Sequence, residues 1–302
     1  MGKLPESLWL YSHGLESVFR SGLALFLLLS GALLIPRVEN PFAFLKKRVL
    51  RIFPAFIIWS LLYAYLNQRL FNVSVLELAV NIWQGMEMHL WFVKVILVLY
   101  VVLAFTGKAI TKSTYQNVLF CWLTGQTLLM VSLIDQETVW IIEARNYLAG
   151  FLLMLLGFML TRTYLPAKKC KNLGMALTAA GITATFAFGY SHSNHTGQLQ
   201  DFYYSIVSPT IQVKSVGIFL LFSTLQVKKE RSRRLLKDLS YSTFGIYLSH
   251  LIFRDSVLHQ VGITYTFINP YLGIVVTALS CFLLSGVFIY LLSKFKFGKL
   301  FT

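Results

Sequence analysis

The chain has 302 residues, of which 56% are hydrophobic and only 13% are charged, and its mean hydropathy is +0.66. These values are typical of a multi-pass membrane protein and exclude an ordinary soluble domain. The formal net charge of +15 does not indicate nucleic-acid binding, because insertion topology and anionic lipid headgroups explain basic residues in short loops beside membrane spans.

The apolar residues fall into separate stretches, each near the ~20 residues that a helix needs to cross a bilayer. We therefore predict an all-α polytopic membrane helix bundle with about nine spans. Residues 1–18 are interpreted as a short polar leader, and residues 19–302 as one transmembrane domain. The predicted spans lie at roughly 19–36, 52–68, 89–107, 116–134, 146–164, 173–190, 205–226, 240–257 and 271–293.

Alternate connections collect the positive charge, holding twenty of the 27 basic residues. By the positive-inside rule these loops are cytoplasmic, so the C-terminus is predicted inside and, with an odd number of spans, the N-terminus outside. Residues 1–18 offer neither a signal sequence nor an earlier span that would carry them across. A tenth helix upstream of Met1 would account for this topology.

The first cytoplasmic connection places Lys47, Arg48 and Arg51 at the entry to the second span. Arg48 and Arg51 are three positions apart, on one side of a helix, where two guanidinium groups suit a phosphate or pyrophosphate. Membrane topology alone would also produce a basic cluster here.

The third span opens with His89, followed by Leu90, Trp91 and Phe92. Aromatic residues at a membrane interface are ordinarily anchors, and a His in that position is often only a solvated end residue. The alternative interpretation is that His89 takes part in chemistry.

The seventh and eighth spans carry ionisable residues near the predicted midplane. In the eighth, Thr243, Tyr247, His250 and Arg254 share one helix face, and His250 lies about 15 Å from the cytoplasmic end. Such residues are functional candidates, although a Tyr and a His also hold bundles together by hydrogen bonds. Lys214, in the seventh span, is open to a packing or snorkelling interpretation.

The three cysteines, Cys121, Cys170 and Cys281, are not placed to form a disulfide or a metal site, so no metal is expected.

Several stretches in order resemble the acyltransferase family 3 of integral membrane O-acyltransferases, which modify bacterial surface polysaccharides and their lipid-linked precursors. No single motif is specific, but the set occurs at matching order, spacing and membrane side over nearly the whole chain. The stretches are Leu25–Gly31, Phe44–Pro54, His89–Phe92, Leu99–Tyr100 and Leu239–His250.

The resemblance implies a ten-helix bundle in the bacterial plasma (inner) membrane. Its activity would be transfer of an acyl group, usually acetyl, from cytoplasmic acyl-CoA to a hydroxyl of a surface polysaccharide or its lipid-linked precursor. Acyl-CoA is the implied co-substrate, and the glycan acceptor and membrane lipids are the implied partners. Carried over by motif, Arg48 and Arg51, with the adjacent Lys47, would bind the donor, and His89, Tyr247 and His250 would be catalytic.

The family also carries an Arg and, about three turns later, a His taken as the catalytic base on its first helix. That helix is expected to be absent here, because residues 1–18 are short and polar, and His13 is not taken as its substitute. Two other interpretations therefore stay open. The first alternative is a transporter or flippase for a small acid or lipid-linked sugar, and the second is an inactive accessory remnant of an acyltransferase.

Overall fold

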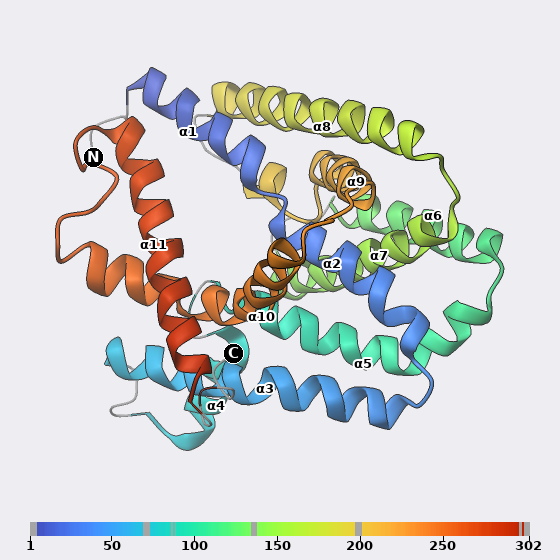
Figure 1. Cartoon of the computed structure of the whole chain (residues 1–302), viewed down its shortest axis with the longest axis horizontal. Coiled ribbons are helices and arrows are strands. Elements are labelled where there is room, and N and C mark those ends of the chain that lie inside the picture. Colours follow the sequence, from blue (N-terminus) through green and yellow to red (C-terminus); the bar gives the residue numbers. More distant parts are fainter. Residues whose placement is uncertain are drawn as a thin grey trace. The chain divides into compact units, whose positions relative to one another are not determined.

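The computed structural model describes residues 5–68, 73–85, 87, 89–133, 138–196, 201–295 and 298, and it contains no strand in these ranges. The structure is built from α-helices joined by short connections (Figure 1). They are α1 Glu6–Phe19, α2 Gly22–Leu34, η1 Ile35–Arg37, α3 Pro41–Leu66, α4 Val75–Gly85, α5 Trp91–Lys112, α6 Tyr115–Ser132, α7 Val139–Arg162, α8 Ala167–Thr196, η2 Asp201–Tyr204, α9 Pro209–Ser223, α10 Glu230–Ile252, η3 Phe253–Leu258 and α11 Pro270–Ser293.

Every predicted apolar stretch falls on a helix, which confirms the all-α polytopic class. Within the described ranges, 7 helical segments are long and apolar enough to cross a membrane. Helices α6 and α10 are not among them. Charged residues crowd the first turns of α10, which begins at Glu230, ten residues before the predicted span.

The first helix differs from the polar leader predicted for residues 1–18, because residues 6–19 form α1. Trp9, His13 and Ser17 recur every four residues and therefore share one face of the helix. His13 and Ser17 on this face are buried, and Trp9 and His13 lie against Tyr190 and Phe186 of α8. Packing against α8 supplies the burial that the short segment cannot provide alone.

The chain divides into two compact units, one formed by Met1–Phe44 with Val98–Gln226 and the other by Leu45–Leu97 with Val227–Thr302. In the first unit, α2 lies against α7 and α8 lies against α9 (Figure 1). A side chain at Gly31 would collide with the backbone of Met154, and one at Gly157 with the backbone of Leu28. Small residues thus allow α2 and α7 to approach at backbone distance, as is common between membrane helices.

The second unit combines most of the long helix α3 with α10, η3 and α11. Trp59 of α3 is buried and its ring meets Phe288 of α11 edge-on, with ring centroids 6.5 Å apart. The Tyr63 hydroxyl, one turn further along α3, donates a hydrogen bond to the Leu248 carbonyl of α10 at 2.9 Å. These contacts fix the end of α3 against the segment of α10 that carries the predicted site residues.

Candidate active site

All six residues predicted for catalysis or donor binding lie in the second unit, within Leu45–Leu97 and Val227–Thr302. Tyr247 and His250 occupy the last turns of α10, and His89 lies just before α5 begins at Trp91. The structure brings these three side chains together. The His89 ring centroid is 5.0 Å from that of His250 and 5.6 Å from that of Tyr247.

The protonation pattern of His250 follows from its hydrogen bond. Its Nδ1 lies 2.7 Å from the Tyr247 carbonyl oxygen, one turn earlier on α10. A carbonyl can only accept, so in the neutral imidazole Nδ1 carries the proton and donates it. The second nitrogen, Nε2, is left with its lone pair. His250 is therefore held in the tautomer that a general base requires.

His89 is oriented in a related way. Its Nε2 lies 3.4 Å from the Leu248 carbonyl oxygen, a long contact that a donated N–H would make. The Tyr247 hydroxyl donates a hydrogen bond to the His89 carbonyl oxygen, so the backbone of His89 is tied to α10. The His89 Nδ1 is buried without a hydrogen-bond partner among the described residues. A second imidazole lone pair thus faces the interior beside His250.

Tyr63 also lies against these residues, although no sequence pattern singled it out. The side chain is 4% exposed, and its ring centroid lies 5.3 Å from that of His89. A single aromatic residue in an apolar span has no pattern that separates chemistry from packing. Its four-residue spacing from Trp59 places both on one face of α3, but the sequence does not say what that face meets.

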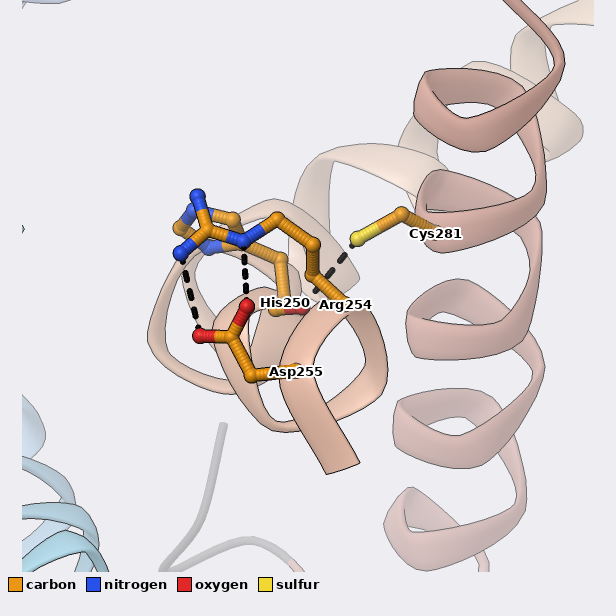
Figure 2. A network of polar contacts seen from close by, with 4 residues as sticks. All are labelled: His250, Arg254, Asp255 and Cys281. Carbon is orange, nitrogen blue, oxygen red and sulfur yellow. Dashed lines mark hydrogen bonds and ion pairs between the residues drawn. The ribbon is translucent and has the colours of Figure 1, made fainter. Parts of the chain in front are cut away.

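A short π-helix, η3, follows His250 and carries Arg254 and Asp255. The Arg254 Nε and Nη2 donate to the two Asp255 carboxylate oxygens at 2.6 and 3.0 Å (Figure 2). On the other side, the Cys281 thiol of α11 donates to the His250 carbonyl oxygen at 3.1 Å. The thiol contact holds the end of α10 against α11, whereas the ion pair lies within η3.

The basic residues predicted to bind the donor lie elsewhere on α3. Arg48 is half-buried, whereas Lys47 and Arg51 are exposed. Arg51 precedes Tyr63 by twelve positions, or about 18 Å along a helix axis. Arg48 and Arg51 thus lie on the same helix as Tyr63 but well away from the cluster that Tyr63 forms with His89.

The first unit contains a separate polar cluster around His13, which sequence reasoning set aside. His13 is 3% exposed; its Nε2 lies 2.9 Å from the Phe186 carbonyl oxygen, and Nδ1 accepts from the Tyr204 hydroxyl. Both ring nitrogens are therefore engaged. The signal that would have found this cluster is the four-residue repeat of Trp9, His13 and Ser17.

Lys214 belongs to the same unit and is fully buried. Its Nζ donates to the Ser17 carbonyl oxygen at 2.6 Å, in the last turn of α1. A cation at a helix C-terminus is favourable because the last carbonyls have no partner within the helix. The ammonium group therefore holds α1 against α9, and the snorkelling interpretation does not apply.

Within the described residues, no three His, Cys, Asp or Glu side chains are grouped so that they would hold a metal ion.

The family model described as an acyltransferase domain (Acyl_transf_3) matches residues 2–293, a range that includes α1 and both histidine clusters. No curated protein and no solved structure matches the chain. A family match over nearly the whole length shows that the chain belongs to this family, and its apolar helices make it a multi-pass membrane protein.

Proposed function

We propose that this membrane acyltransferase moves an acyl group, acetyl in the first instance, from cytoplasmic acyl-CoA to a hydroxyl of a surface glycan or its lipid-linked precursor. The observation that carries the proposal is the hydrogen bond from His250 Nδ1 to the Tyr247 carbonyl oxygen, which leaves Nε2 as a base. Membership in the family indicates an acyl-transfer reaction in general. The donor, the acceptor and the residue roles are our proposal.

In the proposed reaction His250 Nε2 takes the proton from the acceptor hydroxyl as its oxygen attacks the thioester carbonyl. The C–S bond then breaks, an ester forms, and the imidazolium returns the proton to the CoA thiolate. Tyr247 and His89 keep His250 in place, Tyr247 through its carbonyl and hydroxyl groups and His89 by packing against the imidazole.

The donor would bind along α3. Arg48 and Arg51 would grip the phosphates of CoA at the cytoplasmic end, with Lys47 beside them. The length of α3 between Arg51 and Tyr63, about 18 Å, matches a ligand whose charged nucleotide and reactive thioester are joined by a long flexible arm. Binding and chemistry would then take place at opposite ends of the same ligand.

The test of the base is replacement of His250 by Gln in purified protein reconstituted with membranes of the native host, which contain the glycan acceptor. With radiolabelled acetyl-CoA, we expect product formation to fall by about 10²–10⁴-fold in the H250Q variant. His259→Gln is the matched control, since His259 is exposed and lies beyond η3. If product formation fell equally in the two variants, His250 would not be the base.

His13 is the competing base, because the family places its catalytic His on the first helix. Its geometry favours His250 instead, since an acceptor hydroxyl would have to displace Tyr204 from Nδ1. The His13→Gln variant, assayed in parallel, separates the two. Loss of turnover in H13Q with full turnover in H250Q would place the base on α1.

The donor site is tested by Arg48→Gln and Arg51→Gln. We expect each to raise KM for acetyl-CoA with kcat nearly unchanged, because the lost contacts are made equally in the ground and transition states. Lys46→Gln, an exposed neighbour on the same helix, is the control. An unchanged KM would exclude the pair from the donor site.

The same assay addresses the two other functions that the sequence left open. A transporter or flippase would move labelled substrate without forming an acylated product, and an accessory protein would do neither. The buried Lys214 is weak support for transport, because its ammonium group is already bound to the Ser17 carbonyl oxygen.

A further inference from the structure

The Arg254–Asp255 ion pair joins two residues that are adjacent in sequence. Neighbours in an α-helix do not face each other, so such a pair is unusual. Here the helix widens into the π-helical turn η3, and the two side chains meet in a bidentate arrangement (Figure 2). Single-turn π-helices occur frequently at functional sites. The widening thus fixes the direction of the Arg254 guanidinium.

Stability does not explain the pair. The Arg254 and Asp255 side chains are 55% and 58% exposed, and exposed ion pairs contribute only about 0–1 kcal/mol. A guanidinium has five N–H groups, and Asp255 receives two of them. Within the part of the chain that the structure describes, the other three N–H groups make no hydrogen bond and can serve a ligand, while the carboxylate holds the plane of the guanidinium in place.

The guanidinium is also close to the proposed base. Arg254 follows His250 by four residues, about 6 Å along the helix axis, and Figure 2 shows its side chain running back toward the His250 imidazole. Arg254 interacts electrostatically with both His250 and His89. A cation held in place by Asp255 thus lies on the same side of the chain as the His250 side chain.

Acyl transfer creates a negative charge at a defined point, the thioester carbonyl oxygen. When the acceptor oxygen attacks, the C=O bond becomes a C–O⁻ single bond until the C–S bond breaks and the carbonyl forms again. Donors that are already oriented toward that oxygen stabilise the transition state more than the ground state.

We propose that Arg254 is a catalytic residue that donates N–H groups to this oxyanion, and that Asp255 is the residue that positions it. The inference rests on the proposed function, because it takes His250 as the base and a thioester as the acyl donor. It adds a transition-state contact that neither the family match nor the sequence motifs assign.

The test compares Arg254→Gln, Arg254→Lys and Asp255→Asn with wild type in the reconstituted acetyl-CoA assay. For R254Q we expect kcat to fall by about 10²–10³-fold, the cost of losing one oxyanion donor, with KM for acetyl-CoA unchanged within about threefold. R254K should recover part of the loss by restoring the charge. D255N should lower kcat by about tenfold, since the amide oxygen of Asn can still accept one of the two hydrogen bonds from Arg254.

Arg234→Gln is the matched control, because Arg234 also forms an exposed ion pair on α10, with Glu230 at 3.3 Å, but lies sixteen residues before His250. If R254Q and R234Q have the same kcat, or if R254Q raises KM at constant kcat, Arg254 is not an oxyanion donor. An inactive wild type would instead refute the proposed function. Active wild type with an unaffected R254Q refutes this inference alone.

Discussion

The contact between α2 and α7 allows a sharp test of how the first unit is held together. Replacing Gly157 by Ala adds one methyl group, which would lie 2.7 Å from the Leu28 carbonyl carbon and 2.9 Å from its Cα, with the carbonyl oxygen nearer still. Ordinary contact begins at 3.4 Å, so the two helices must separate by at least about 0.7 Å. The new methyl group would meet backbone atoms of Leu28, so no side-chain rotation can relieve the clash.

The cost can be estimated from dispersion. A buried Leu makes on the order of 40–60 heavy-atom contacts of about 0.1–0.2 kcal/mol, and a gap of this size forfeits a quarter to a half of each. Leu28 is fully buried, so its share alone is about 1–6 kcal/mol. Overpacked cores typically lose about 1–3 kcal/mol, and we expect G157A to lose about 3 kcal/mol.

The control is Gly286→Ala in α11, where the new methyl group would meet Ile246 Cδ1 at an ordinary 3.6 Å and no other atom of the described residues within 4 Å. Both substitutions remove a helical Gly and gain about 0.5–1 kcal/mol in helix propensity, so only the packing differs. Unfolding in mixed micelles with a rising fraction of denaturing detergent, followed by circular dichroism, gives the two midpoints. A G157A midpoint at or above that of G286A would refute the reasoning.

Three further changes test individual contacts. Tyr204→Phe should lower stability by about 1–3 kcal/mol in the same unfolding assay, because it leaves the buried His13 Nδ1 without a donor. Lys214→Met should speed backbone amide hydrogen exchange at the end of α1, since the Ser17 carbonyl loses its partner; unchanged exchange there would mean that α1 is held by packing alone. Asn269→Ala should cost about 0.5–2 kcal/mol by removing the N-cap of α11, and an unshifted unfolding midpoint would contradict this.

The residues that the sequence singled out for chemistry all lie in one unit, in motifs at or near the ends of its helices. His89 lies in the turn just before α5, and Tyr247 and His250 lie in the last turns of α10. Their mutual contact was not predictable, because it depends on which faces of α10 and of the segment before α5 meet. Tyr63 shows the same limit, as an aromatic residue whose partners come from elements far along the chain.

The sequence by itself determined the all-α class and the family, because apolar runs of bilayer length and motif order are properties of the linear chain. It was misleading at the N-terminus, where residues 6–19 are too polar to be recognised as a buried helix until α8 and α9 cover them. Only the tertiary structure decided the tautomer of His250, the pairing of Arg254 with Asp255 and the burial of His13 and Lys214. Each depends on an atom supplied by a neighbouring turn or another helix, which residue order alone does not place.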